Sequence, residues 1–111
     1  MAITNVAAGS QTCVINTVHT LSTRTVFGSY QGYINLTNLA KGDAIRVIVS
    51  TKVLTGDVEE NVFDHPFSND LLDSCIICTP PWISEFSTSL KIQQTLGTGR
   101  VVPWVLYRLD S

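Results

Sequence analysis

The chain contains 111 residues, of which 44% are hydrophobic and only 14% are charged, and its formal net charge is −2 at pH 7. This length predicts one domain, and the weakly negative charge excludes a surface built to bind a nucleic-acid backbone. No apolar stretch is long enough to cross a membrane, and the first residues lack the basic and apolar regions of a signal peptide.

Apolar and polar residues alternate with a period of two along most of the chain, which predicts strands with one buried face. In chain order, the expected strands cover residues 12–21, 30–37, 45–53, 58–63, 75–79, 90–96 and 101–109. The alternation is clearest over Ile45–Val53. Val101–Leu109 is apolar at both alternating sets of positions, which is typical of a strand covered on both faces.

Evidence for helix is limited to one turn after Ser68-Asn69-Asp70, where residues that cap helices precede two leucines. β-Branched residues are abundant, and they suit strands better than helices. Glycine, proline and aspartate separate the expected strands at short intervals. We therefore predict a single all-β domain over residues 1–111, an antiparallel β-sandwich with a jelly-roll-like arrangement of about seven or eight strands.

Gly97-Thr98-Gly99-Arg100 has glycines at the spacing of a phosphate-binding loop. Such a loop requires a following helix, whose N-terminal amides bind the anion. A β-rich segment with Pro103 follows instead, so residues 96–100 are predicted to form a hairpin loop in which glycine supplies a positive φ. Because proline cannot donate to a strand ladder, we expect a sheet edge or a bulge at Pro103.

Cys75-Ile76-Ile77-Cys78 has the C-x-x-C spacing of redox and zinc sites. The two isoleucines favour a strand, in which residues three apart point to opposite faces, so a buried thiol pair is the main interpretation. A zinc site stays open as an alternative, with Cys13, His19 and His65 as the remaining ligands. Three cysteines, an odd number, argue against a disulfide framework.

Asp64-His65-Pro66 and the acids around it are candidates for acid–base catalysis or for calcium binding. Catalysis requires a nucleophile or substrate pocket beside the base, and a calcium loop requires acids that alternate around a glycine turn. Neither pattern is present, so these residues are interpreted as exposed loop charges. We predict no enzymatic activity, no catalytic residue, no cofactor and no metal.

Charges are segregated along the sequence. Between Val53 and Leu90 there are seven acidic and no basic residues, so this segment carries −7 and the flanks carry +5. The segment is either a set of solvated loops or a dipolar surface that orients the protein against a partner or its own copies. The charged fraction is well below the typical value of about 25%, which indicates that another chain covers part of the surface.

Five aromatic residues are candidates for a sugar-binding face: Tyr30, Tyr33, Trp82, Trp104 and Tyr107. Packing in a core or an interface is the commoner role of such side chains because each one buries a large area. A tail or surface module that binds host glycan through an aromatic patch is therefore kept as an alternative function.

Three stretches carry a family resemblance: the start MAITN, the central GYINLTNLAKGDAIRVIV (32–49) and the end LKIQQTLGTGRVVPWVLYRL (90–109). In these stretches the chain resembles small virion proteins of tailed bacteriophages. Their shared features are an L-x-x-L-x-x-G-D turn into a strand and the run T-L-G-T-x-R-x-(I/V)-P-W. The acidic middle of the chain is not part of the resemblance.

The resemblance implies a structural virion protein that decorates or cements the capsid and binds the major capsid protein and its own copies. It implies a location on the capsid surface after synthesis in the host cytoplasm, and a small closed ring such as a trimer, because decorating proteins commonly occupy symmetry axes. No nucleic-acid or membrane partner is expected. The candidate contact residues are the less confined aromatic and charged ones: Trp82, Tyr33, Arg24, Arg100 and Glu59.

Overall fold

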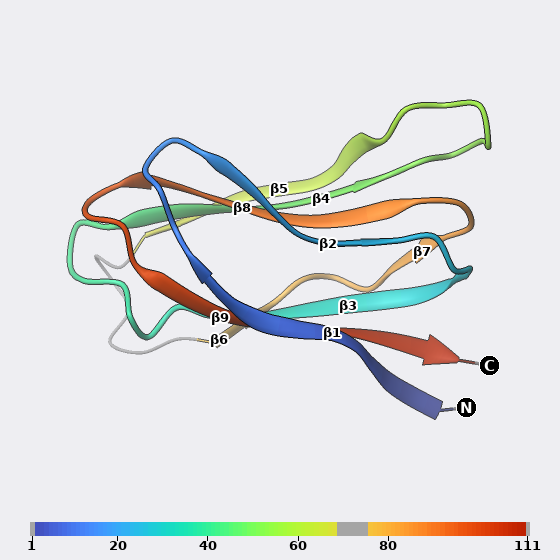
Figure 1. Ribbon diagram of the computed structural model, residues 1–111, viewed down its shortest axis with the longest axis horizontal. Coiled ribbons are helices and arrows are strands. Elements are labelled where there is room, and N and C mark those ends of the chain that lie inside the picture. The colour runs from blue at the N-terminus through green and yellow to red at the C-terminus, as the bar shows by residue number, and fades with distance from the viewer. Residues whose placement is uncertain (1, 69–75, 111) are drawn as a thin grey trace.

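The computed structural model describes residues 2–68 and 76–110, and within these residues the chain forms nine β-strands and no helix (Figure 1). In chain order they are β1 (Ala2–Thr12), β2 (Val18–Arg24), β3 (Gly28–Asn35), β4 (Ala44–Thr51), β5 (Glu60–Ser68), β6 (Ile76–Cys78), β7 (Trp82–Ser84), β8 (Thr88–Leu96) and β9 (Val101–Asp110). The predicted all-β class is confirmed. The helical turn predicted after Ser68 lies outside the described residues.

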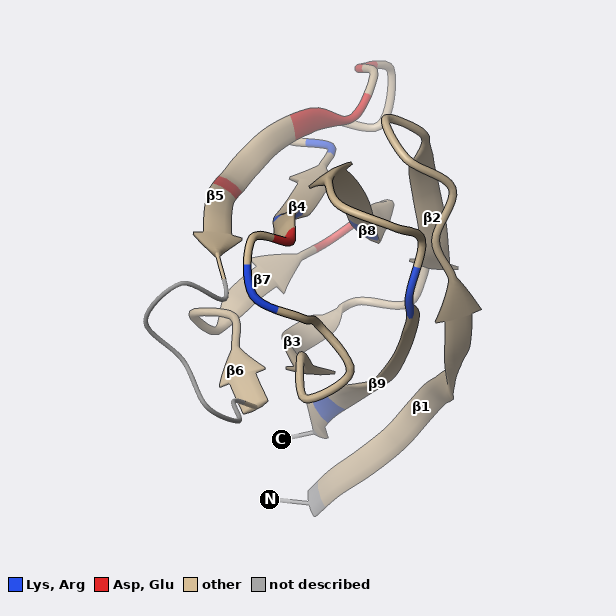
Figure 2. Cartoon of the chain, turned by 90° about the vertical axis from the view of Figure 1, so that its left-hand side faces the viewer, with Lys and Arg blue, Asp and Glu red and all other residues tan. Residues whose placement is uncertain are grey.

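The strands form two antiparallel sheets that pack face to face as a sandwich (Figures 1 and 2). Sheet A has the order β1-β9-β3-β6, with β7 also paired to β3, and sheet B has the order β2-β8-β4-β5. This is the strand order of a jelly roll if β6 and β7 together fill one position. The predicted jelly-roll-like sandwich is confirmed, and the strand count exceeds the expected seven or eight because Thr79-Pro80-Pro81 interrupts the strand that pairs with β3.

The core lies between the sheets and takes alternate residues from the central strands of both. The side chains that are at most 1% exposed include Tyr30, Ile34, Ile45, Val47, Val49, Leu90, Ile92, Val102 and Leu106. β-Branched and leucine side chains at every second position thus place one face of each sheet in the interior, as the period-two pattern predicts.

The glycine loop after β8 is not a hairpin, which corrects the prediction for residues 96–100. β8 lies in sheet B and β9 in sheet A, so the loop crosses from one sheet to the other. The buried Gln94 side chain holds the loop from inside: its Nε2 donates to the carbonyls of Leu96 and Thr98, and its Oε1 accepts from Arg100 N. A short loop can therefore span the two layers without leaving its backbone groups unpaired.

Asp43 occupies the space beneath the same loop. Asp43 is 3% exposed, and its carboxylate accepts from Ala40 N and from Arg100 Nε, both at 2.8 Å. Gly97 has the predicted positive φ, at 95°, and a Cβ built on it would lie 1.8 Å from Asp43 Oδ1. The loop therefore requires glycine at position 97 for both conformation and space.

The expected first strand, residues 12–21, is wrong. β1 ends at Thr12, and the chain turns at residues 13–17, where Asn16 adopts a φ of 63°. Val14 N donates to His19 Nε2 at 3.0 Å, which closes the turn before β2. β1 itself was not predicted, because its sequence of mostly small and polar residues lacks the alternation of a half-buried strand.

The region around Asp64-His65-Pro66 was interpreted as a loop, but it lies within β5, an edge strand of sheet B. Asp64 forms an ion pair with Arg46 of the neighbouring β4. Pro66 is tolerated there because the outer edge of β5 carries no partner strand among the described residues.

The edge that was predicted at Pro103 is present on one side of β9. The β3–β9 ladder ends at the pair Ile34↔Trp104, whereas Pro103 is still paired with Ser10 of β1. Pro103 thus lies one residue before the first β9 residue that pairs with β3, where its missing N–H costs no ladder hydrogen bond.

Replacing Gly97 by alanine is expected to destabilise the fold by about 2 kcal/mol or more, because the new methyl group meets the Asp43 carboxylate and the backbone has a positive φ. The control is Gly56→Ala in the β4–β5 loop, where nothing lies within 4 Å of an added Cβ. That change should alter stability by less than about 0.5 kcal/mol. Urea unfolding measures both, and equal effects of the two substitutions would contradict the role given to the Asp43 contact.

Candidate interaction surface

The two outer faces of the sandwich differ in chemistry. The outer face of sheet B carries charged and amide side chains, with Arg46 bonded to both Asp64 and Gln93, and with Lys91 beside them on β8. Among the described acidic residues of the middle segment, Asp57, Glu59, Glu60 and Asp64 lie on β5 or on the loop before it (Figure 2), and Glu85 lies in the loop after β7. The outer face of sheet B is thus typical of a sheet surface in contact with water.

The outer face of sheet A carries no Asp, Glu, Lys or Arg among its described side chains. The register and the alternation along β3 and β9 direct the odd-numbered residues outward, opposite the core residues. We call the apolar members of this face the outer-face patch; they are Ile3, Tyr33, Ile76, Ile83, Val101, Pro103, Val105, Tyr107 and Leu109. The most accessible are Ile83, 71% exposed, Ile3, 67%, and Ile76, 64%.

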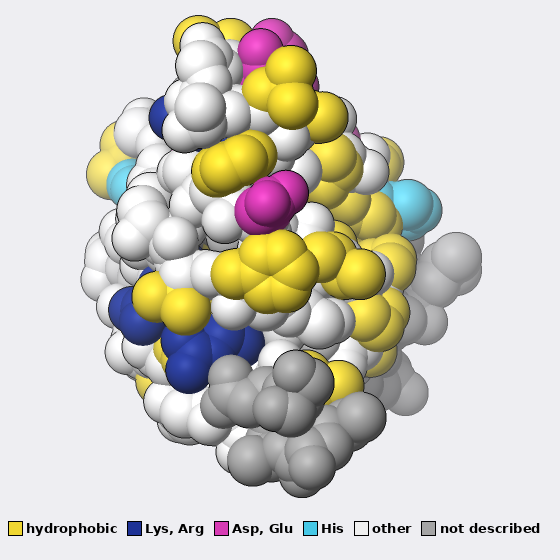
Figure 3. Space-filling view, turned by 90° about the vertical axis from the view of Figure 1, so that its right-hand side faces the viewer, with side chains coloured by type: hydrophobic (Ala, Val, Ile, Leu, Met, Phe, Trp, Pro, Cys, Tyr) yellow, Lys and Arg dark blue, Asp and Glu magenta, His cyan; other side chains and the backbone are white. Residues whose placement is uncertain are grey.

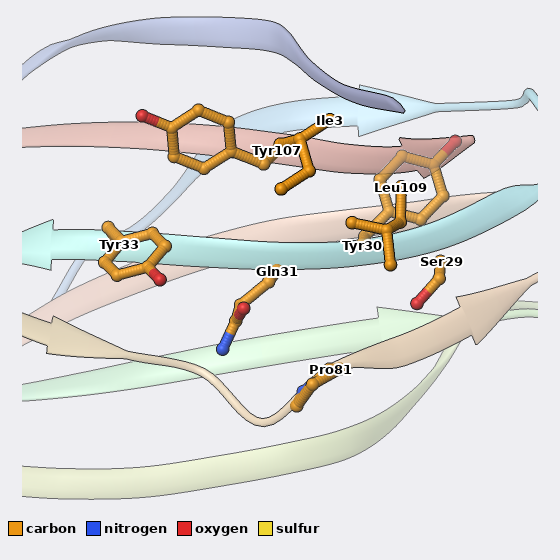
Figure 4. Close-up of a pocket in the computed structure, with 8 residues that line it drawn as sticks. All are labelled: Ile3, Ser29, Tyr30, Gln31, Tyr33, Pro81, Tyr107 and Leu109. Carbon is orange, nitrogen blue, oxygen red and sulfur yellow. The ribbon is translucent and has the colours of Figure 1, made fainter. Parts of the chain in front are cut away.

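Tyr33 and Tyr107 form a ridge in the middle of the outer-face patch. Their rings meet edge to face with centroids 5.7 Å apart. On one side of the ridge lies a depression of about 450 Å³, lined also by Ser29, Gln31 and Leu109 (Figure 4). On the other side lies a depression of about 330 Å³, lined also by Ile76 and Pro103. The face is therefore shaped to receive two protruding groups beside a pair of aromatic rings.

Exposed apolar side chains also gather at the end of the sandwich that carries the loops β2–β3, β4–β5 and β7–β8, which is the right-hand end of Figure 1 and faces the viewer in Figure 3. Phe27 is 66% exposed and Leu54 is 63% exposed. Acidic side chains interrupt this group, as Figure 3 shows. The outer-face patch is the more uniform apolar surface because no charge is placed within it.

The five aromatic candidates do not form one sugar-binding face. Tyr30, Trp82 and Trp104 face the interior; the Trp82 ring stacks on Tyr30 at 5.9 Å, and its Nε1 donates to Thr88 Oγ1 at 2.9 Å. Only Tyr33 and Tyr107 share the outer face. The alternation of Gly28–Asn35 could have shown this division, since it places Tyr30 and Tyr33 on opposite faces.

The charged candidates are bound within the chain. Arg100 pairs with the buried Asp43, and Glu59 accepts from Ser50 Oγ at 2.9 Å and from Ser87 Oγ. Arg24 is half-buried at the end of β2, and its Nε has no hydrogen-bond partner in the described part of the chain. Of the five candidate contact residues, the structure thus places only Tyr33 on the outer-face patch, and a contact role for Trp82, Arg24, Arg100 and Glu59 remains a prediction.

The cysteine prediction is partly corrected. Cys78 is exposed rather than buried, because β6 pairs with β3 such that Cys78 lies opposite the outward-facing Tyr33. Cys75 lies outside the described residues. Cys13 is buried, and its burial raises the pKa of the thiol. Within residues 2–68 and 76–110, no three His, Cys, Asp or Glu side chains lie together as a metal site would require.

No protein-family model matches the chain, and no curated protein is significantly similar to it. Over the part of the chain that is described, no helix has the length and apolarity needed to cross a membrane. The function must therefore be inferred from the surface of the fold itself.

Sequence analysis missed most of the outer-face patch. Tyr107, Leu109, Ile83 and Ile3 were not among the candidate contact residues. The signal was present in Val101–Leu109, whose apolar residues at both sets of alternating positions were attributed to cover on both faces. In the structure one set enters the core and the other remains at the surface of the molecule.

Glu59 is expected to make stability depend on pH. Burial disfavours its charged form, but hydrogen bonds from Ser87, Ser89 and Ser50 and the charge of Lys91 outweigh burial and hold its pKa below the usual 4.5. Because the pKa is lower in the folded state, the stabilisation is present above about pH 4.5 and is lost as pH falls through the folded value.

The test is Glu59→Gln, followed by chemical denaturation from pH 7 to pH 3. The variant should be less stable than the wild type at neutral pH, by less than about 1 kcal/mol because solvent screens a partly exposed group. The difference should shrink as the pH falls below about 4.5. A difference that stays constant over the whole range would refute this role of the carboxylate.

Proposed function

We propose that the protein is a structural component of a tailed-bacteriophage virion that decorates the capsid shell and binds the major capsid protein through the outer-face patch. The observation that carries the proposal is that this entire face of sheet A is apolar or uncharged among its described side chains, whereas the opposite face is charged. The action is mechanical and involves no chemical turnover.

The composition of the outer-face patch suits a protein interface. Soluble monomers rarely expose large apolar patches, and the centres of interfaces are depleted in charge and enriched in aromatic residues. Tyr33 and Tyr107 stand at the centre of this face between two depressions, the position in which anchoring residues of interfaces are found. Burial of such an apolar surface contributes roughly 25 cal/mol per Å² to the free energy of binding, before the entropic and desolvation costs of association are subtracted.

Two further observations favour a capsid as the partner. The stretches that resemble phage virion proteins, 32–49 and 90–109, include parts of β3, β4, β8 and β9, the strands that form the core and the outer face. Jelly rolls also occur in viral capsid proteins, which is an argument by analogy of fold. Many copies on one lattice would add avidity to a modest contact made by each copy.

Glycan binding is the second candidate function, as a tail or surface module. One observation favours it: the larger depression combines two tyrosine rings with the amide of Gln31 and the hydroxyl of Ser29 (Figure 4). Sugar sites use aromatic faces together with a few polar groups of this kind. A glycan array that gives hits lost in Tyr33→Ala but kept in Trp82→Phe would favour this function over capsid binding.

The capsid proposal is tested by adding purified protein back to particles that lack it. Ile83→Asp places a charge on the outer-face patch and should weaken binding at least about tenfold, because a carboxylate would be desolvated without a partner. The matched control is Thr20→Asp on the outer face of sheet B, which should bind like the wild type. Quantitative mass spectrometry should find copies numerous enough to cover the shell.

Binding that survives Ile83→Asp but is lost in Thr20→Asp would place the contact on the outer face of sheet B and reject the outer-face patch as the binding surface. Only a few copies per particle would reject shell decoration and point to a tail component.

A further inference from the structure

The sandwich has unequal sheet edges. β1 ends sheet A and β2 ends sheet B on one side, and β5, β6 and β7 lie on the other side. β5 carries Asp64 and Pro66, β6 and β7 have three residues each, and β2 has seven residues including Arg24. β1 is eleven residues long and contains no charged residue and no proline. It therefore lacks the charges and prolines by which proteins protect an edge strand from pairing, and its one register shift, between Asn5 and Ala7, leaves residues 7–12 regular.

Cys13 N donates to Arg100 O, so the backbone groups of Cys13, the residue after β1, point toward β9. Backbone N–H and C=O groups alternate in direction along a strand, so those of Gln11, Gly9 and Ala7 also point toward β9. The N–H and C=O groups of Ala8, Ser10 and Thr12 point away from the sheet. Among the described residues no strand pairs with that edge.

Few side chains form hydrogen bonds with the outward backbone groups of Ala8, Ser10 and Thr12. The Thr12 carbonyl accepts from Gln11 Nε2 at 2.8 Å, and a carbonyl oxygen can accept a second hydrogen bond. Ala8, Ser10 and Thr12 are all exposed. The free edge is thus open to a further strand.

The regular part of this edge is bounded on both sides. The register with β9 shifts between Asn5 and Ala7, and the chain turns away after Thr12. Ser10 is the midpoint of the three residues whose backbone groups face outward. An antiparallel copy of the same strand, centred on Ser10, therefore pairs all three: Ser10 with Ser10, and Ala8 with Thr12 in both directions.

The side chains permit this pairing. Gly9 lies opposite Gln11 in the proposed register, and no position places like charges opposite each other, because β1 has none. Small residues leave the backbones free to approach to ladder distance. The self-complementary register lets a second copy of this chain satisfy every outward backbone group of residues 8–12 at once.

We propose that two copies pair through β1 about a two-fold axis at Ser10, which joins their A sheets into one continuous sheet. Such an axis is perpendicular to the sheet and keeps both outer-face patches on the same side. The pairing does not depend on the capsid partner. It would give that partner two patches side by side, whereas the family resemblance implies a three-fold ring.

The test uses the purified full chain in sedimentation equilibrium over a concentration series. The wild type should be a dimer, and Ser10→Pro should weaken dimerisation at least about tenfold, because it removes an N–H that faces the free edge and leaves the ladder with β9 intact. Ser10→Thr keeps that N–H and should remain dimeric. Urea unfolding of each variant shows whether the fold is retained.

A covalent test keeps the proposal falsifiable if Ser10→Pro fails to fold. In a chain with Cys75→Ser and Cys78→Ser, Ser10→Cys should form a disulfide between copies under mild oxidation, since facing hydrogen-bonded residues have Cα atoms about 5.5 Å apart. The control is Thr20→Cys on the other edge strand of that side, which should stay monomeric on a non-reducing gel.

A wild type that sediments as a monomer or a trimer would overturn the proposal, as would equal crosslinking of the two cysteine variants. Because no particle is present, these results are independent of capsid binding: a dimer that does not bind capsids would reject the proposed function alone.

Discussion

The alternation of side chains along β3 and β9 is the constraint on which the structure depends. These two strands are neighbours in sheet A, and their inward side chains Tyr30, Ile34, Val102 and Leu106 lie in the core. In each strand, the residues that alternate with these inward ones form the outer face. Ile34 and Leu106 therefore cannot be buried unless Tyr33 and Tyr107 face outward. The stability of the fold and the chemistry of its exposed face are thus set by the same two segments.

A second requirement is the connection between the two sheets. The loop from β8 to β9 crosses the sandwich and is held by three polar side chains: Gln94, Asp43 and Arg100. Gln94 and Asp43 are buried, and each forms hydrogen bonds to backbone groups of the loops that they contact. Buried polar groups satisfied in this way specify one conformation more sharply than apolar packing does. Here they place the beginning of β9, and with it the outer-face patch.

The sequence allowed the fold to be predicted better than the site. The strands with strong alternation, such as Ile45–Val53 and Leu90–Leu96, were found to within a few residues, because burial of one face leaves a clear pattern. β1 was missed since an edge strand of mostly small and polar residues buries little and shows no such pattern. The loop between β8 and β9 was misassigned because local turn chemistry does not reveal whether the next strand joins the same sheet.

The site was harder to predict because exposure is a property of the packed sheets. Arg100 was selected as a free charge, yet a buried carboxylate 57 positions away in the chain binds it. Trp82 was named as a contact residue, yet its register with Tyr30 turns it inward. Tyr33 lies on the exposed side, and its contact with Tyr107 became visible only when β3 and β9 were paired.

The central claim is that the outer-face patch is the surface that another protein covers. Hydroxyl-radical footprinting of the protein, free and bound to capsids, tests it directly by measuring side-chain oxidation residue by residue. The account predicts that oxidation of Tyr33, Tyr107 and Ile83 falls on binding, while that of Leu96, which is 59% exposed on sheet B, stays unchanged. Protection of Leu96 without protection of the two tyrosines would contradict it.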